Sequence, residues 1–544
     1  MATLSVTAEG QNGAVAVVGS LYFTRIREVI AVSPEAYIAR KYFVLNLFKS
    51  SNMRGPMLSK KNRKTIMSAL SPSSDPAHSP ADGLDPVRAA HISARIDRLP
   101  AVATLWKLVA LLSIGGFFEL YDLFQTAYIS PGLIRAGLFA TGAEGVFGFS
   151  DQAAFASATF LGLFLGASLL SPIADRYGRR AIFTFALVWY TLATVLMGLQ
   201  TSALGIICMR FLVGIGLGIE LVTIDAYLSE LVPKRMRSSA FAFAFFVQFL
   251  SVPAVALMSW WLVPQDPFGY SGWRFVVIAS AVFALFIWWL RSRLPESPRW
   301  LAQHGRFAEA EKIMDDLEAR CIKDHGKTLD APETHNVAVE GKGRFADIWQ
   351  PPYRRRALML IVFHVFQAIG FFGFGNWLPA LLSGQGVSVT HSLGYAFIIT
   401  LAYPLGPLLF VKLANRFENK WQIVGSALGA MIFGTLFAQQ TTPVGLIFCG
   451  VMITFCNAWL SFSYHSYQSE LFPTNIRARA VGFCYSFSRL STVFSSLLIG
   501  LFLDHFGTPG VLTFIVVSML IVIITIGTFG PKTRNLALED IAHR

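Results

Sequence analysis

The chain has 544 residues, of which 54% are hydrophobic and only 14% are charged, and its mean hydropathy is +0.53. A soluble globular chain carries roughly 25% charged residues, so this composition excludes an ordinary soluble enzyme and a largely disordered chain. The net charge of +13 would suggest a nucleic-acid partner in a soluble protein. Here the basic residues lie between apolar runs, so we expect an all-α integral membrane protein with the lipid bilayer, and no nucleic acid, as its partner.

The first 103 residues differ in composition from the rest of the chain. They combine a basic cluster over 60–64 with a stretch rich in Ser, Pro and Asp over 71–85. This mixture predicts a cytoplasmic N-terminal tail over 1–103 with no packed core. No signal-peptide pattern occurs in it, and three internal methionines offer alternative start positions, namely Met53, Met57 and Met67.

Long apolar runs separated by short polar breaks begin at Leu105. A membrane-spanning helix needs about 20 predominantly apolar residues, and this length predicts twelve transmembrane helices. The runs lie near 105–130, 152–174, 181–199, 203–229, 238–263, 273–290, 357–382, 389–411, 421–439, 443–471, 480–503 and 510–529. Six of these runs precede a longer polar stretch and six follow it.

The polar stretch divides the chain into two parts of similar design. We expect a six-helix bundle over 104–292, a cytoplasmic loop over 293–353, a second six-helix bundle over 354–530 and a cytoplasmic tail over 531–544. In the loop, the segment RFAEAEKIMDDLEARC has helical spacing and mixed charge, which predicts a soluble helix. Lys and Arg concentrate in alternate breaks between the runs, and this bias places both termini and the loop in the cytoplasm.

An internal repeat relates the two halves. Residues 227–240 (YLSELVPKRMRSSA) and 467–480 (YQSELFPTNIRARA) share Tyr, Ser, Glu, Leu, Pro, Arg and Ala at the same spacing. At the same offset, DRYGRR over 175–180 falls on NRFENK over 415–420. Two homologous halves are typical of transporters with a substrate site at the bilayer midplane between them.

These motifs resemble the major facilitator superfamily over about residues 104–530. DRYGRR resembles the D-R-x-G-R-R motif of that family, and Arg210 with the glycines up to Gly218 resembles its R-x-x-x-G-x-G-x-G motif. The run PESPRWL over 295–301 resembles the sugar-porter and metabolite:proton symporter branches, although Asp225 stands where sugar porters have Pro. The resemblance implies no enzyme but a secondary transporter of the bacterial inner membrane that works by alternating access.

Three charged residues within the apolar runs are candidates for proton coupling. A charge at the bilayer centre costs at least ~2.5–3.5 kcal/mol, so Glu119, Asp122 and Arg210 need partners or a change of protonation. Asp122 and Arg210 both lie about 10–12 Å from the outer ends of their runs, where they could pair. We predict that Asp122 exchanges a proton as Arg210 moves, the alternative being a static ion pair. Glu119, on the same helix face, is a second proton carrier, a substrate partner or a satisfied polar residue.

Arg489 is the mid-membrane cation of the second half and predicts an anionic substrate. A guanidinium binds a carboxylate through two parallel hydrogen bonds, and the alternative is a fixed ion pair with a carboxylate such as Glu119. His465 lies close to the cytoplasmic end of its run, and we do not expect it to carry protons. Further candidate substrate ligands are one mid-depth carboxylate and four polar or aromatic groups suited to a metabolite pocket, namely Glu220, Asn376, Trp377, Gln367 and Asn457.

A set of residues in the cytoplasmic breaks predicts gating. Pairs of Glu230 with Arg176 or Arg179, and of Glu470 with Arg416, would close the cytoplasmic side, and Asp175 would meet basic groups or a helix N-terminus. The alternative is a charge set that only fixes topology. The complete set is Asp175, Arg176, Gly178, Arg179, Arg180, Glu230, Arg237, Arg416, Glu470 and Arg477.

The sequence offers no motif for nucleotide binding or hydrolysis, and its five cysteines have no C-x-x-C spacing. We therefore expect no cofactor and no metal site. The expected function is proton-coupled symport of a small organic acid or related metabolite by a monomer. Two alternatives stay open: a sugar or neutral-metabolite uniporter or symporter, and a transporter-fold nutrient sensor.

Overall fold

The computed structural model describes residues 85–170, 178–291, 294–332, 345–406, 417–472 and 474–533. Within these ranges the regular secondary structure is helical throughout, without a strand. Most of the predicted N-terminal tail and of the C-terminal tail lies outside the described residues. The all-α class predicted from the composition is confirmed for the part of the chain that the structure describes.

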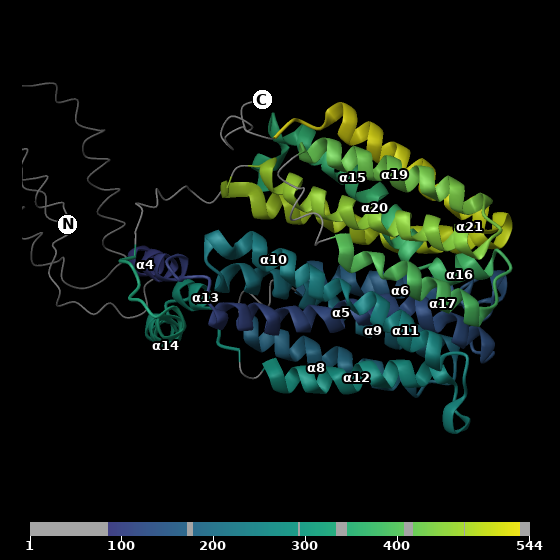
Figure 1. Ribbon diagram of the computed structural model, residues 1–544, viewed down its shortest axis with the longest axis horizontal. Helices are drawn as coiled ribbons and strands as arrows, with labels where there is room; N and C mark the ends of the chain where they lie inside the picture. Colours follow the sequence, from purple (N-terminus) through teal and green to yellow (C-terminus); the bar gives the residue numbers. More distant parts are fainter. Residues whose placement is uncertain are drawn as a thin grey trace, which may run out of the picture. The chain divides into compact units, whose positions relative to one another are not determined.

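A first helix group contains the apolar helices between residues 103 and 291 (Figure 1). Its members are α5 (Ala103–Arg135), α6 (Asp151–Leu165) with its continuation η2 (Gly166–Leu170), α8 (Arg179–Gly198), α9 (Ala203–Leu231), α10 (Lys234–Phe249), α11 (Ser251–Leu262) and α12 (Gly272–Arg291). Short helices η1 (Gly142–Glu144) and η3 (Pro267–Gly269) lie in the connections after α5 and α11.

A second helix group contains the helices between residues 353 and 529. Its members are α15 (Tyr353–Gly375), α16 (Leu378–Ser383), α17 (Val389–Thr400), α19 (Asn419–Gln439), α20 (Pro443–Glu470) and α21 (Thr474–Phe529). Within α21, Gly507 has a φ of 64°, so the helix is broken there into two segments. This break lies between the predicted runs 480–503 and 510–529.

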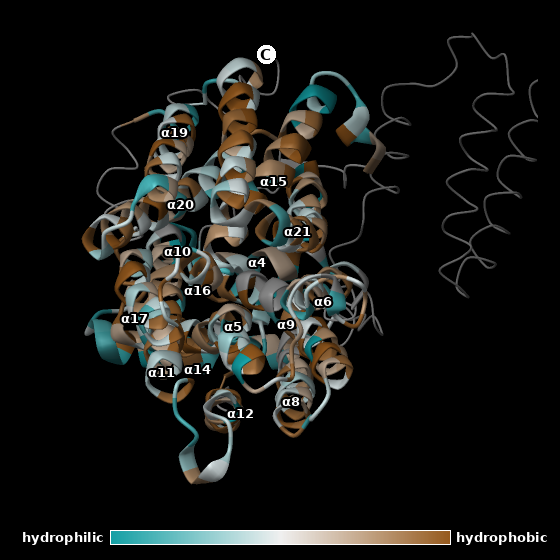
Figure 2. Ribbon diagram, turned by 90° about the vertical axis from the view of Figure 1, so that its right-hand side faces the viewer, coloured by the Kyte–Doolittle hydropathy of each residue, from teal (hydrophilic) through white to brown (hydrophobic). Residues whose placement is uncertain are grey.

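The helices present apolar side chains on their outer faces, as a protein in lipid must. Seven stretches of the described helices are long and apolar enough to cross a membrane. Figure 2 shows hydrophobic residues along the outer helices α8 and α19. Exposed examples are Leu192 of α8, Phe286 of α12 and Ile432 of α19. Water would penalise this surface, whereas hydrocarbon does not.

Glycines allow α6 and α9 to pack at close range. A Cβ atom added at Gly218 of α9 would lie 2.3 Å from the backbone oxygen of Leu163, and one at Gly162 of α6 would lie 2.2 Å from that of Phe211. Both distances are too short for any side chain, so each helix occupies the groove that the other's glycines leave open. Gly218 is the last glycine of the R-x-x-x-G-x-G-x-G motif, so this part of the motif serves helix packing.

The two helix groups meet closely at the end that carries loops 136–150 and 263–271. A Cβ atom at Gly500 of α21 would lie 2.6 Å from that of Ala153 near the start of α6. Near the end of α11, the ring of Trp260 stacks on Phe397 of α17 at 6.2 Å and lies against Gly394. We call this set of five residues the closed end: Ala153, Trp260, Gly394, Phe397 and Gly500.

A small helical unit lies outside the apolar helices. It consists of α4 (Pro86–Asp97), α13 (Pro298–Gln303) and α14 (Phe307–His325), followed further along the chain by η4 (Phe345–Trp349). The helix predicted for RFAEAEKIMDDLEARC is confirmed as α14. The sequence predicts no packed structure before residue 103, and α4 departs from that expectation.

Local signals in the sequence explain α4. The Asp85 carboxylate accepts hydrogen bonds from the backbone N–H groups of Val87 and Arg88, and Pro86 occupies the first turn. Ile92 and Ile96 lie one turn apart on the face that α4 buries, and each is only 1% exposed. The helix is therefore capped at its start and amphipathic along its length.

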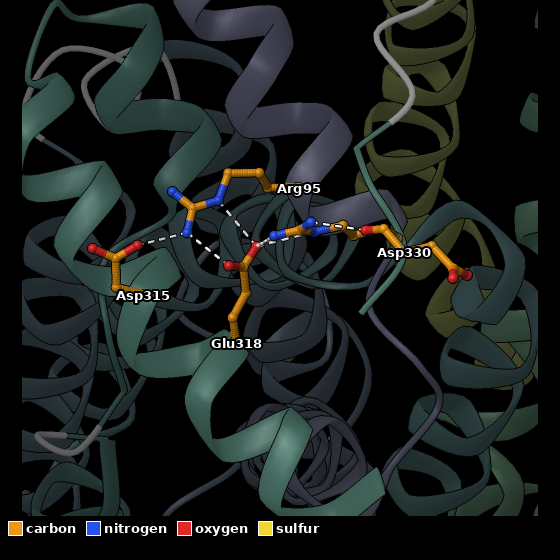
Figure 3. A network of polar contacts seen from close by, with 5 residues as sticks. Arg95, Asp315, Glu318 and Asp330 are labelled. Atoms are coloured by element: carbon orange, nitrogen blue, oxygen red, sulfur yellow. Dashed lines mark hydrogen bonds and ion pairs between the residues drawn. The ribbon is translucent and has the colours of Figure 1, made fainter. Parts of the chain in front are cut away.

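Charged side chains fasten α4 to α14 (Figure 3). Glu318 of α14 receives hydrogen bonds from Arg95 at 2.8 Å and from Arg98 at 2.7 Å, and Arg95 also contacts Asp315 at 2.6 Å. Burial alone would raise the pKa of Glu318, but the hydrogen bonds from the two arginines lower it below its ordinary value. On the other side of α4, Asp97 accepts from Arg299 at 2.8 Å.

Candidate functional site

A cavity lies between the two helix groups. Residues from α5, α9 and α10 of the first group and from α15, α20 and α21 of the second group form its wall. Its empty space is about 840 Å³, a volume that includes the opening to solvent. Its polar and charged wall residues, apart from the aromatic ones, are Glu119, Gln248, Gln367, Ser461, Ser488 and Arg489.

Arg489 contributes a guanidinium group to the wall of this cavity. Its side chain leaves α21 one turn after Tyr485, and its Nη2 donates a hydrogen bond to the Tyr485 hydroxyl at 3.0 Å. The guanidinium carbon lies 5.5 Å from the ring centre of Phe372 and 5.2 Å from that of Tyr485, so two aromatic faces hold it. Arg489 is only 6% exposed, and its Nη1 has no hydrogen-bond partner among the described residues.

No described carboxylate lies within ion-pair distance of Arg489. The alternative of a fixed ion pair with Glu119 is therefore absent from the described residues, although Glu119 lines the same cavity and is 5% exposed. Gln367 of α15 also reaches the wall, as predicted. The cavity thus combines one guanidinium, one carboxyl group and several neutral hydrogen-bonding groups.

Arg210 and Asp122 are in contact, but the Arg210 guanidinium binds the main chain of Asp122 and not its carboxylate. Arg210 is fully buried, and its Nη2 donates to the main-chain carbonyl oxygen of Asp122 and to the Thr126 hydroxyl at 2.6 Å. Its Nε donates to the Thr159 hydroxyl at 3.0 Å. The Asp122 carboxylate is buried beside this cation, and its Oδ1 has no hydrogen-bond partner among the described residues. Arg210 therefore joins α9 to α5 and α6 through hydrogen bonds that do not use the Asp122 carboxylate, which interacts with Ser280 of α12.

Four predicted substrate ligands do not line the cavity. Trp377 is 2% exposed within the hydrophobic core, Asn376 ends α15, and Glu220 is fully buried in α9. Asn457 donates to the backbone oxygen of Gly370 at 3.4 Å and so joins α20 to α15. A role of these four in substrate binding stays a prediction.

Sequence reasoning missed most of the cavity's aromatic residues, among them Tyr485 and the phenylalanines. Tyr485 lies four residues before Arg489, and this helical spacing alone would have placed the two side chains together. His465, which we do not expect to carry protons, lies on the wall. The other aromatic wall residues are Phe124, Phe245, Phe249, Phe371, Phe372 and Tyr464.

Among the predicted gating residues, Gly178 has the clearest structural role. It precedes α8 with a φ of 102°, a conformation that favours glycine. A Cβ atom there would lie 2.8 Å from Oε2 of Glu296 and 3.3 Å from Trp300, both in the PESPRWL motif. The connection before α8 therefore packs against this motif, and its positive φ would strain any other residue at this position.

The other predicted gating contacts are only partly described. Asp175, Arg176 and Arg416 lie outside the described residues, so the pairs that involve them stay predictions. Arg179 and Arg180 begin α8, and Glu230 lies near the end of α9. Arg237 donates to the backbone oxygen of Ser229 and Arg477 to that of Phe472, both at 3.1 Å. Glu470 accepts from Asn419 at 3.3 Å.

The apolar helices around a central, partly polar cavity define a membrane transporter of the major facilitator type. The family model described as "Sugar (and other) transporter" matches residues 108–544, and the chain belongs to this family. It is accordingly a membrane transport protein and not an enzyme.

Curated relatives and solved structures agree with this assignment. The chain is 29% identical to the putative metabolite transport protein YyaJ of Bacillus subtilis, over 81% of this chain and 95% of that protein. It is 26% identical to the niacin transporter NiaP of Acinetobacter baylyi, over 82% and 98% of the two chains. The xylose transporter XylE from E. coli, in a partially occluded inward open conformation, matches with a TM-score of 0.66 at 17% identity. This match covers 80% of this chain and all of that one, and it shows the shared fold.

Proposed function

We propose that this chain is a proton-coupled symporter that carries a small organic anion by alternating access. The observation that carries the proposal is Arg489: a buried guanidinium on the cavity wall, with a free Nη1 and no described carboxylate within ion-pair distance. A buried unpaired charge is costly, and an anionic substrate would offset that cost through a charge-assisted, two-point hydrogen bond.

Two carboxyl groups of α5 are the proposed proton carriers. Glu119 lies on the wall of the cavity, and Asp122 lies about one turn further along α5, beside Arg210. A proton taken up by either group would remove a buried negative charge, and it would cross the membrane when the cavity changes sides. Protonation and anion binding at one cavity would couple the two fluxes.

The proposed topology has twelve membrane helices in two six-helix bundles, with both termini and the central loop in the cytoplasm. The alternation of basic breaks along the chain supports this orientation, and the two helix groups on either side of the cavity support the two bundles. We further propose a monomer in a bacterial inner membrane. The A. baylyi relative transports niacin, which is a carboxylate, and this name supports an anionic cargo.

Uptake into proteoliposomes with an imposed pH gradient tests the proposal. The assay uses labelled aromatic acids, aliphatic carboxylates and sugars, with wild type, Arg489→Gln and Arg306→Gln. We expect the pH gradient to drive accumulation of a carboxylate, and Arg489→Gln to abolish it. Arg306 lies outside the apolar helices and pairs with Glu309, so its variant is the matched control and keeps activity.

Other outcomes would refute the proposal in distinct ways. Sugar flux that ignores the pH gradient would indicate a uniporter. Ligand binding without any flux would indicate a nutrient sensor. Carboxylate uptake that survives Arg489→Gln unchanged would show that the anion binds elsewhere.

A further inference from the structure

The cavity wall is unusually rich in aromatic rings, and both helix groups contribute them. Phe245 and Phe249 of α10 face it from the first group. Phe371 and Phe372 of α15 and Tyr485 of α21 face it from the second. A ligand in this space therefore meets aromatic side chains from both helix groups. Flat aromatic ligands gain from such contacts beyond the simple burial of apolar area, whereas aliphatic ligands do not.

Two polar groups of the cavity flank one of these rings. The Arg489 guanidinium carbon lies 5.2 Å from the ring centre of Tyr485, and the ring centre of His465 lies 5.9 Å from the same point. His465 also stacks on Tyr464 at 4.2 Å and lies 5.7 Å from Phe245. The imidazole is thus held between aromatic neighbours, at a fixed place relative to Arg489.

The hydrogen bond of His465 determines which of its ring nitrogens can act as an acceptor. Nδ1 lies 2.7 Å from the backbone oxygen of Ser461. A carbonyl oxygen only accepts, so Nδ1 carries the hydrogen and Nε2 of the neutral ring is an acceptor. No hydrogen bond to Nε2 occurs among the described residues. The cavity therefore offers a cation at Arg489 and an acceptor at His465.

From this arrangement we propose that the cavity selects a planar aromatic carboxylate with a hydrogen-bond donor on its ring. This inference rests on the proposed function and names its substrate class. The carboxylate binds Arg489, the ring lies between the aromatic side chains of the two helix groups, and the ring donor, such as a phenolic hydroxyl, binds Nε2 of His465. His465 then determines specificity and takes no part in proton transfer.

Titration calorimetry on the purified full chain tests the proposal with defined probes. Benzoate and cyclohexanecarboxylate differ in aromaticity at equal charge, and 3- and 4-hydroxybenzoate differ from their methyl ethers by the ring donor. We expect benzoate to bind about threefold to tenfold more tightly than cyclohexanecarboxylate. At least one hydroxybenzoate should bind about fivefold more tightly than its ether.

Variants at His465 assign the second preference to its acceptor. His465→Phe keeps an aromatic ring and removes Nε2, so it should abolish the preference for hydroxyl over ether and leave the preference for benzoate intact. His465→Gln restores an acceptor oxygen and should recover part of the hydroxyl preference. The matched control is His391→Phe, at an exposed histidine in α17, and it should change neither preference.

The outcomes separate this inference from the function on which it rests. Equal binding of benzoate and cyclohexanecarboxylate, both lost in Arg489→Gln, would overturn aromatic selection and leave anion transport standing. A hydroxyl preference that persists in His465→Phe would overturn the role of His465. Failure of every carboxylate to bind would overturn the proposed function itself.

Discussion

Arg210 donates a hydrogen bond to the main-chain carbonyl oxygen of Asp122, and its guanidinium makes no ion pair with the carboxylate of that residue among the described contacts. The cation is close enough to interact with this carboxylate, yet it does not consume the carboxylate's hydrogen-bonding capacity. The hydrogen bonds by which Arg210 joins the helices do not involve this carboxylate, so protonation of Asp122 would leave them in place. The two residues therefore have separable roles. A variant of Asp122 should lose coupling, whereas a variant of Arg210 should lose stability.

Asp122→Asn should lose coupling and keep the fold. The amide cannot ionise, so we expect no accumulation driven by a pH gradient, while exchange of labelled for unlabelled substrate continues. Comparing the two assays in the same proteoliposomes measures the difference. Asp316→Asn, in α14 outside the apolar helices, is the control. Accumulation at the wild-type level in Asp122→Asn would exclude this residue as the coupling group.

Arg210→Gln should instead destabilise the protein. It removes the hydrogen bonds to Thr126, Thr159 and the Asp122 backbone at a fully buried site, and it leaves a buried carboxylate without its neighbouring cation. A buried polar group left without its partner costs about 1–3 kcal/mol, and Arg210→Gln removes the partner of three such groups, whereas Asp122→Asn leaves these hydrogen bonds in place. Thermal unfolding in detergent should show a lower midpoint than Asp122→Asn, and an equal midpoint for the two variants would contradict this account.

Acid should release α4 from α14. Because its folded-state pKa is lowered, Glu318 contributes stability that is complete above its ordinary value of 4.5 and is lost as the pH falls below it. Hydrogen exchange of residues 86–97, corrected for the intrinsic rate at each pH, should therefore rise in acid. At pH 7, Glu318→Gln should weaken protection by about 1–3 kcal/mol.

The control for this measurement is Arg88→Ala. Arg88 pairs with Glu311, but both side chains are about half exposed, at 54% and 42%, and such pairs contribute roughly 0–1 kcal/mol. Equal effects of Arg88→Ala and Glu318→Gln would show that burial of the Glu318 network does not hold α4.

Gly218→Ala should separate α6 from α9. The added methyl group would fall 2.3 Å from the backbone oxygen of Leu163, and backbone cannot move aside as a flexible side chain can. Overpacking of this kind costs about 1–3 kcal/mol. Gly425→Ala in α19 is the matched control, since its Cβ atom meets open space. A thermal midpoint for Gly218→Ala at or above that of Gly425→Ala would contradict the packing role.

Much of the fold was predictable because each signal was local. The spacing of RFAEAEKIMDDLEARC predicts α14, and the apolar runs from Leu105 onward predict helices of both helix groups. The position of α4 was not predictable in the same way, although its cap was. Its twelve residues follow a stretch of disorder-like composition, and the groups that hold it, such as Glu318, lie some 220 residues away in the chain.

The candidate site was predictable to the extent that burial of charge is costly. That rule leads to Arg489 and Glu119, and both line the cavity. The cost of burial does not say which face of a helix meets the cavity, so Trp377 and Asn376, although suited to a metabolite pocket, lie away from its wall. Helical spacing alone predicts the contacts of Tyr485 and His465. Tyr485 lies four residues before Arg489, and His465 lies four residues after Ser461, whose backbone oxygen it contacts.

The closed end has a kinetic consequence for an alternating-access carrier. Its contacts are apolar and small: a glycine against Ala153, and the Trp260 ring over Gly394 and Phe397. Such contacts separate without breaking an ion pair, so their free energy adds only a modest increment to the barrier of the step in which the empty carrier returns. A side chain at Gly500 would place its Cβ atom 2.6 Å from that of Ala153, and one at Gly394 would place it 3.0 Å from the Trp260 ring. Under the proposed alternating access, either substitution would disfavour the closed end whatever the protein carries.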